Sequence, residues 1–191
     1  MASFKVYLAD PLGCVSADLK LKINTQLQTW FKQCAGASGQ AFDDAVVSWL
    51  ASTPSLQPHE LLLFFVPDRS KSIATELGKS PGDDSNGFTA WVSGATGAAV
   101  SEVYVSAVRA NGARAAALGF HELMHNKLRL NDAMHAKGGL AADSVDEATQ
   151  LSKTNVSDMG AALKNTTLQY MKGYESAATG RNDPLSRYYT I

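Results

Sequence analysis

The sequence has little of what marks disulfide-rich or nucleic-acid-binding proteins. Only two of its 191 residues are cysteines, Cys14 and Cys34, which is too few for a disulfide scaffold and not the spacing of a zinc knuckle. We expect both to be small, partly buried side chains rather than a disulfide pair. Lysine and arginine (17) nearly balance aspartate and glutamate (18), leaving a formal net charge of −1. This balance gives no electrostatic reason to expect nucleic acid or an anionic membrane as a partner.

Long apolar runs are also missing. The longest, Leu-Leu-Leu-Phe-Phe-Val at 61–66, has the length of a buried strand, whereas a transmembrane helix needs roughly 18 apolar residues. Residues 1–13 lack the basic flank and the apolar segment of a secretory signal. We therefore expect a chain that is cytoplasmic or exported without a leader. With 45% hydrophobic and 18% charged residues, residues 1–191 are expected to form a single domain.

The order of apolar patterns predicts an α+β fold with a mixed sheet. The strands expected from β-branched and aromatic content lie at 4–10, 60–68, 88–93 and 101–108. The helices expected from helical spacing of apolar residues lie at 17–35, 42–52, 111–130, 145–153 and 158–179. Residues 1–130 are therefore expected to form a lobe of sheet and helices, and residues 131–191 a smaller helical lobe. The polar segment 70–87 is expected to be a solvated surface loop, with a cleft wall as the alternative.

The segment that carries chemistry is His121-Glu122-Leu123-Met124-His125, an H-E-x-x-H pattern. Histidines four residues apart lie one turn apart on a helix, so both imidazoles can reach one metal ion. Glu122 projects about 100° around the helix from His121. Its carboxylate can therefore stand beside the metal and take a proton from a water molecule there.

Chance is a poor explanation of this pattern. With four histidines and six glutamates in the chain, random placement predicts roughly 0.003 such patterns. The alternative is an amphipathic helix whose histidines face solvent. A second His-Glu pair, His59-Glu60, begins a strand and has no histidine four residues after His59, so we interpret it as a strand edge only.

A catalytic zinc site needs three protein ligands and an open position, and His135 is the favoured third ligand. It lies ten residues beyond His125. Asn131-Asp132 can end the helix and Gly138-Gly139 can turn the chain sharply, so a loop can carry His135 back to the metal.

Three carboxylates are alternative third ligands. Glu147 lies 22 residues beyond His125, a workable distance for a glutamate on a following helix, but Ser144 and Glu147 also fit a capping box. Asp132 and Asp143 can ligate zinc, yet both also suit the end of a helix.

The chain here resembles the zincin metallopeptidases, and within them the metzincin branch. That branch has a helix, a mixed sheet with an antiparallel edge strand, a helix bearing H-E-x-x-H, a third ligand on a loop, a methionine turn beneath the metal and a C-terminal helix. The resemblance covers most of the chain as an order of elements. It implies that His121 and His125 bind zinc, that Glu122 is the general base, and that 87–93 or 101–107 is the edge strand along which a peptide pairs.

The resemblance also implies a methionine turn at 156–160, with Met159 under the zinc; ordinary core packing is the alternative. The chain departs from the metzincin pattern after His125, where that pattern has glycine at the third residue and a ligand at the sixth. Those places hold Leu128 and Asn131, so the helix is expected to run about one turn further. No tyrosine follows Met159 at the family's usual place, which leaves Tyr170 and Tyr174 as loose candidates for stabilising an oxyanion.

These features predict a zinc metalloendopeptidase that acts on a peptide or protein substrate. Zinc held by His121, His125 and His135 would polarise the scissile carbonyl, and Glu122 would act as general base and then general acid. Two alternatives stay open: a non-catalytic zinc-binding or interaction module of zincin fold, and a leaderless toxin or effector hydrolase. The sequence does not indicate an oligomeric state.

Overall fold

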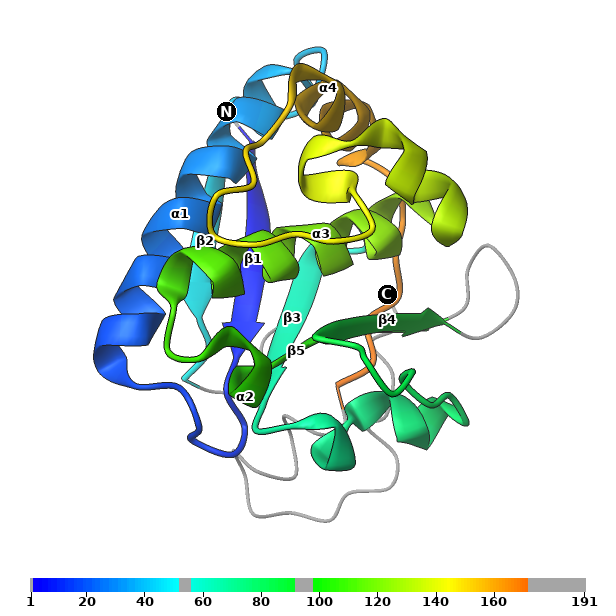
Figure 1. Cartoon of the computed structure of the whole chain (residues 1–191). Helices are drawn as coiled ribbons and strands as arrows, with labels where there is room; N and C mark the ends of the chain where they lie inside the picture. Colours follow the sequence, from blue (N-terminus) through cyan, green and yellow to red (C-terminus); the bar gives the residue numbers. More distant parts are fainter. Residues whose placement is uncertain (1, 52–55, 92–97, 172–191) are drawn as a thin grey trace.

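The computed structural model describes residues 2–51, 56–91 and 98–171. Its centre is a five-stranded sheet with the order β2-β1-β3-β5-β4 (Figure 1). Four strands run parallel, and β4 runs antiparallel to β5 at one end of the order, with Thr89 opposite Ser101. The strands are β1 (Ser3–Ala9), β2 (Asp44–Trp49), β3 (Leu61–Val66), β4 (Gly87–Trp91) and β5 (Ala99–Tyr104).

The α-helices are α1 (Ala17–Gly36), α2 (Val105–Val108), α3 (Gly112–Leu128) and α4 (Lys153–Ala162). The 3₁₀ helices are η1 (Arg69–Lys71), η2 (Ile73–Leu77), η3 (Asp132–Lys137) and η4 (Gly139–Ala141). In the described part of the chain, no helix is both long and apolar enough to cross a bilayer.

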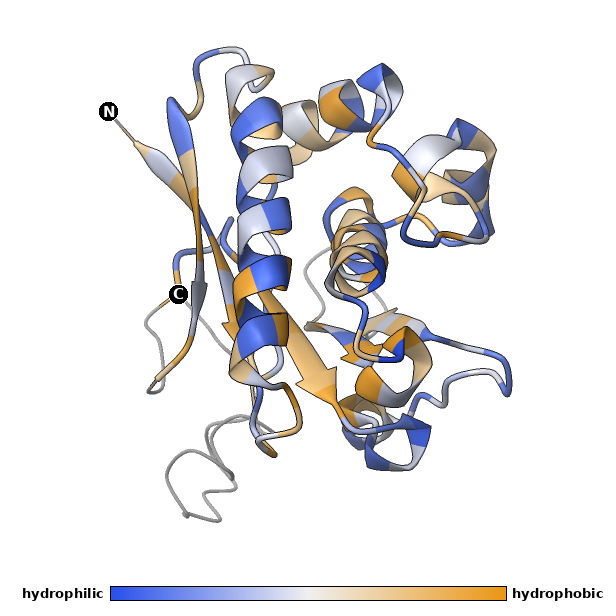
Figure 2. Cartoon of the chain, turned by 60° about the vertical axis from the view of Figure 1, so that its left-hand side comes forward, coloured by the Kyte–Doolittle hydropathy of each residue, from blue (hydrophilic) through white to orange (hydrophobic). Residues whose placement is uncertain are grey.

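Alternation along β3 divides the core into two apolar clusters. Leu61, Leu63 and Phe65 pack with α1 and α3 on one face of the sheet, whereas Leu62 and Phe64 pack with η2 and residues 170–171 on the other. Figure 2 shows β3 as apolar along its length, as expected for a strand covered on both faces. The helix predicted at 17–35 is confirmed as α1, whose buried side carries an apolar stripe of Leu19, Ile23, Leu27, Trp30 and Phe31.

The helix predicted at 42–52 is wrong, because Asp44–Trp49 is strand β2. Val46 pairs with Lys5 and Val47 with Val6 of β1. Adjacent β-branched residues fit a pleated edge strand better than a helix, and the pairing with β1 decides between the two. The strand predicted at 101–108 is also too long, since its last four residues form α2.

The helix predicted at 145–153 is absent from this described segment. Asp146 accepts hydrogen bonds from the backbone N–H groups of Ala148 and Thr149, which makes a local turn in place of a helix. The capping box lies later, where Ser152 and Asn155 begin α4. The helix predicted at 158–179 therefore begins and ends early, and the remainder beyond residue 171 lies outside the described residues, as do the last two residues of the strand predicted at 88–93.

Segment 70–87 is not a solvated loop throughout. Ile73, Ala74 and Leu77 of η2 are buried against the sheet, and residues 82–86 line a cleft. The cleft-wall alternative therefore describes the later part of this segment.

Residues on both sides of position 130 share one apolar cluster. Met134, Leu140 and Met159 pack in the same cluster as Phe4 and Leu63. The predicted division into lobes at this position stays a prediction. Cys14 and Cys34 are free thiols, as expected, and burial raises the pKa of each to about 12.

Candidate metal centre

The helix α3 carries the H-E-x-x-H segment and has defined ends. Its N-cap is Asn111, whose side chain accepts hydrogen bonds from the N–H groups of Ala113 and Arg114. It ends at Leu128 because Arg129 adopts a left-handed conformation (φ 54°, ψ 38°). The prediction that the helix continues one turn further is therefore wrong, and residues 129–131 form the turn that leads into η3, which carries His135.

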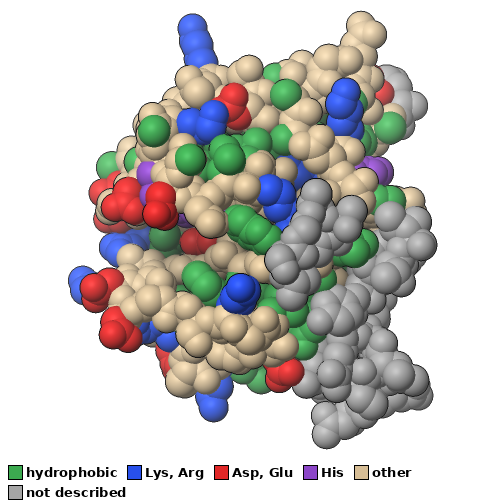
Figure 3. Space-filling model, turned by 90° about the vertical axis from the view of Figure 1, so that its right-hand side faces the viewer, with side chains coloured by type: hydrophobic (Ala, Val, Ile, Leu, Met, Phe, Trp, Pro, Cys, Tyr) green, Lys and Arg blue, Asp and Glu red, His purple; other side chains and the backbone are tan. Residues whose placement is uncertain are grey.

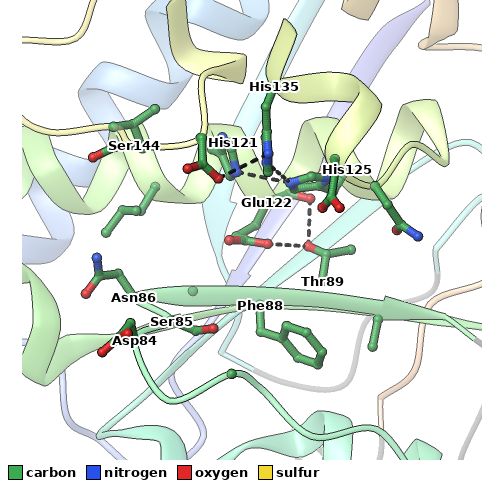
Figure 4. Close-up of a pocket in the computed structure, with 18 of the residues that line it drawn as sticks. Asp84, Ser85, Asn86, Phe88, Thr89, His121, Glu122, His125, His135 and Ser144 are labelled. Atoms are coloured by element: carbon green, nitrogen blue, oxygen red, sulfur yellow. Dashed lines mark hydrogen bonds and ion pairs between the residues drawn. The ribbon is translucent and has the colours of Figure 1, made fainter.

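Three histidines converge on one point (Figure 4). Nε2 of His125 lies 3.0 Å from Nε2 of His121 and 3.3 Å from Nε2 of His135. One ligand atom from each residue lies within 4.8 Å of the others. Ligand nitrogens in a tetrahedral zinc site, each 2.0–2.1 Å from the ion, lie about 3.3–3.4 Å apart. The three imidazoles thus fit a single metal ion with little rearrangement.

The second nitrogen of each ring has its own partner. Nδ1 of His121 donates to the carbonyl oxygen of Leu140 (2.9 Å), and Nδ1 of His125 donates to that of Leu130 (2.6 Å). Nδ1 of His135 lies 3.2 Å from Oδ1 of Asp143. A proton held on Nδ1 leaves the Nε2 lone pair free to bind a metal. All three partners therefore orient the rings toward the common point.

Burial favours the neutral form of the two helical histidines. Desolvation, followed by the neighbouring His125, lowers the pKa of His121 to about 4. Desolvation also lowers the pKa of His125. Both imidazoles are consequently unprotonated at neutral pH, which is the state that binds metal.

The loop after α3 returns His135 to the helix as the sequence predicts. Gly138 and Gly139 both have positive φ angles (63° and 58°), where glycine is favoured. A Cβ on Gly139 would lie 2.4 Å from Oδ1 of Asn155. That oxygen accepts the N–H of Leu140, so Asn155 of α4 fixes the residue whose carbonyl orients His121.

None of the alternative carboxylates joins the group of three histidines in the described structure. Asp143 contacts His135 at Nδ1, which makes it a partner of a candidate ligand. Asp132 lies on the cleft wall, and its charge raises the pKa of His125 as a minor contribution. Glu147 is exposed and is not among the described residues that line the cleft.

The carboxylate of Glu122 lies beside the histidines and above β4 (Figure 4). The residue is 6% exposed, and its Oε2 accepts a hydrogen bond from Oγ1 of Thr89 (2.7 Å). Burial raises the pKa of Glu122 to about 8, although the bond from Thr89 lowers it. A Cβ on Gly87 would lie 2.8 Å from Oε1 of Glu122. Glycine at the start of β4 therefore lets the strand approach this carboxylate closely.

The histidines and Glu122 open into a cleft of about 880 Å³ that is bordered by the whole of β4. Asp83 and Asp84 line one side of the cleft. Asp132 and Asp143 line the other side, on the segment that carries His135. In Figure 3 a groove crosses the surface, and histidine and acidic side chains gather at its left-hand end. Because every residue of β4 borders the cleft, an extended peptide can lie along this strand.

Met159 does not lie in a turn before the last helix. It is buried inside α4 and belongs to the core cluster, which agrees with the packing alternative. Met134, next to His135, is also fully buried in that cluster. Tyr170 is buried in the cluster on the other face of the sheet and is not among the described residues lining the cleft. Tyr174 lies outside the described residues.

Sequence reasoning missed the residues that orient the site. The carbonyl oxygens of Leu130 and Leu140 cannot be recognised from the sequence, because every residue has a main-chain carbonyl. Thr89 lies on an expected strand, but nothing local shows that its hydroxyl meets Glu122. Asp143 is visible in the sequence as an acidic residue near His135, where it is an alternative third ligand. In the structure it contacts Nδ1 of His135 instead.

Replacing Asp143 by alanine is expected to weaken zinc binding about tenfold, because the His135 ring loses the partner of its Nδ1. This loss is at the low end of the range for such partners, since the Asp143 side chain is 87% exposed. The affinity is measured by competition with a chromogenic chelator. Asp84→Ala is the matched control, since Asp84 lies on the opposite side of the cleft (Figure 4). Equal affinities in both variants would contradict an orienting role for Asp143.

Comparison with protein-family models, curated proteins and solved structures finds no match. The function is therefore argued from the residues and their geometry.

Proposed function

We propose that the protein is a zinc-dependent metalloendopeptidase. The observation that carries the proposal is the convergence of three imidazole Nε2 atoms beside a buried glutamate, in a cleft bordered by an edge strand. Three imidazole nitrogen ligands with an open side are the donor set of a catalytic zinc site, whereas structural zinc sites are closed by four protein ligands. When bound, zinc supplies a Lewis acid that polarises a carbonyl and lowers the pKa of a water molecule.

The roles of the residues follow from their positions. His121, His125 and His135 hold the ion through Nε2, and their Nδ1 partners keep the rings in place. Glu122 accepts the proton of the attacking water at a carboxylate oxygen and returns it to the leaving amine. Burial raises the pKa of the Glu122 carboxylate. A carboxylate with a raised pKa is suited both to accepting and to returning a proton near neutral pH.

A peptide is the substrate class that the cleft suits best. The strand β4 is last in the sheet order, and in the described part of the chain its second edge pairs with no strand. All of Gly87–Trp91 borders the cleft. An extended peptide can therefore add to β4 by main-chain hydrogen bonds and present a peptide bond to the metal.

The order of elements supports a metzincin-like arrangement as part of the proposal. The helix α1 lies between the first two strands of a mixed sheet that has an antiparallel edge strand, the H-E-x-x-H helix follows the sheet, and a third histidine lies on η3 in the next connection. The turn after α3 differs, because Arg129 rather than glycine takes the left-handed conformation. The methionine turn is not part of this likeness, since Met159 lies inside α4.

Metal removal tests the proposal. Purified protein is expected to cleave members of a mixed peptide library, detected by mass spectrometry of the products. Dialysis against a chelator should abolish cleavage, and one equivalent of zinc should restore it. Zinc binding without any cleavage would contradict the peptidase and favour the non-catalytic zinc-binding module.

A further inference from the structure

We propose that Thr89 is a positioning residue for Glu122, at the end of a buried hydrogen-bond chain from Gln169 through Asn126 and Ser101. This inference rests on the proposed function, because it assigns Glu122 as the group that is positioned. Its consequence is that β4, the strand along which the substrate is expected to pair, also fixes the general base.

Thr89 lies on the face of β4 that is turned toward α3. Its Oγ1 lies 2.7 Å from Oε2 of Glu122 and 2.8 Å from the main-chain oxygen of the same residue. It also lies 3.0 Å from Oγ of Ser101, its cross-strand partner. A hydroxyl has one proton to donate, so its neighbours determine which of these oxygens receives it.

Those neighbours direct the proton to the carboxylate. Nδ2 of Asn126 donates to Oγ of Ser101 (3.0 Å), which uses an acceptor site of that hydroxyl. The Ser101 hydroxyl then donates to the main-chain oxygen of Glu122 (3.3 Å) or, because hydroxyl protons rotate, to Oγ1 of Thr89, which lies 3.0 Å away. That main-chain oxygen lies within α3, where helical bonding supplies it with a donor. The carboxylate oxygen is left as the best acceptor for Thr89, and a charged acceptor makes the stronger bond.

The far end of this hydrogen-bond chain is Gln169, which lies in the segment after α4. Nδ2 of Asn126 also donates to Oε1 of Gln169 (3.3 Å), and Gln169 forms a parallel bridge with Ala99 of β5. Ser101, Asn126 and Gln169 are each at most 1% exposed. Buried polar side chains with satisfied partners hold few alternative orientations, so the chain is suited to fixing a carboxylate.

The test compares Thr89→Val, which keeps the shape and removes the hydroxyl, with Thr89→Ser, which keeps the hydroxyl. In the zinc-loaded protein, Thr89→Val is expected to lower kcat for a cleaved peptide roughly 10- to 100-fold, since small displacements of catalytic groups have effects of this size. KM and zinc content should change less than about twofold. Thr89→Ser should recover kcat to within about threefold of the wild type. Wild-type kcat in Thr89→Val, or equal losses in both variants, would overturn the proposal.

A second readout separates this inference from the proposed function. In crystal structures of the zinc-loaded variants, the Glu122 carboxylate should leave its wild-type position in Thr89→Val and keep it in Thr89→Ser. This comparison does not depend on peptide cleavage. An inactive wild type with these structures would reject the peptidase and keep the positioning role, whereas an unmoved carboxylate in Thr89→Val would reject the positioning role.

Discussion

Replacing Glu122 with glutamine is expected to leave zinc bound and to lower kcat/KM for peptides by about 10²- to 10⁴-fold, the usual contribution of a general base. Glutamine has the same shape and still accepts a hydrogen bond from Thr89, but its amide cannot take up a proton at neutral pH. Zinc content should not change, because the three ligands are histidines whose Nδ1 partners do not include Glu122.

Glu147→Gln is the matched control for this variant. Glu147 is an exposed glutamate that is not among the described cleft residues, so wild-type kcat/KM is expected there. If Glu122→Gln also hydrolyses peptides at the wild-type rate, Glu122 has no part in the mechanism.

The same variant has a pH-dependent effect on stability in the metal-free protein. The pKa of Glu122 rises from 4.5 to about 8 in the fold, mainly through burial. The folded state therefore keeps a proton that the unfolded state releases between these pH values, and stability falls as pH rises through this window. At about 1.36 kcal/mol per pKa unit, the cost near pH 8 reaches a few kcal/mol.

Glutamine is not subject to this cost. The gain in thermal midpoint of Glu122→Gln over wild type should accordingly be larger at pH 8 than at pH 5. The lowered pKa of His121 destabilises both proteins below pH 6.5 and cancels in the comparison at each pH. Scanning calorimetry after chelation measures both midpoints, and an equal gain at the two pH values would contradict the burial of an ionisable Glu122.

Removing His135 is expected to abolish stoichiometric zinc binding, whereas removing Glu147 should leave it intact. His135→Ala leaves two imidazoles on α3, and Nε2 of His135 is the third nitrogen at the common point. Glu147 is absent from that group. Metal analysis of both variants after dialysis in zinc-free buffer gives the two contents directly.

The outcome that contradicts this ligand set is zinc loss in Glu147→Ala with retention in His135→Ala. That result would require Glu147 to reach the histidines from its exposed turn, and it would move the protein to a different branch of zincins.

Local patterns were sufficient for the elements with strong periodicity. The helix α1 and the buried strand β3 both appear where the sequence predicts them. Residues 42–52 were misassigned because Asp44–Trp49 becomes a strand through parallel pairing with β1, a contact that local spacing does not contain. The same limit applies to 145–153, where one aspartate side chain binds backbone N–H groups and makes a turn.

The site shows the same division between local and long-range information. His121, Glu122 and His125 follow from helical spacing alone. His135 was predictable because glycines at 138 and 139 let the chain turn back, although the helix ends earlier than expected at Leu128. Thr89 contacts Glu122 from 33 residues away, so only the folded sheet brings the two together.

Zinc content per chain in the purified wild-type protein tests the central claim most directly. The protein is dialysed against zinc-free buffer, and metal and protein are quantified in the same sample. Three converging Nε2 atoms predict close to one zinc ion per chain, and close to none when His121 and His125 are both replaced by alanine. Wild-type protein that binds no added zinc, or a double variant that keeps a full equivalent, would contradict the account.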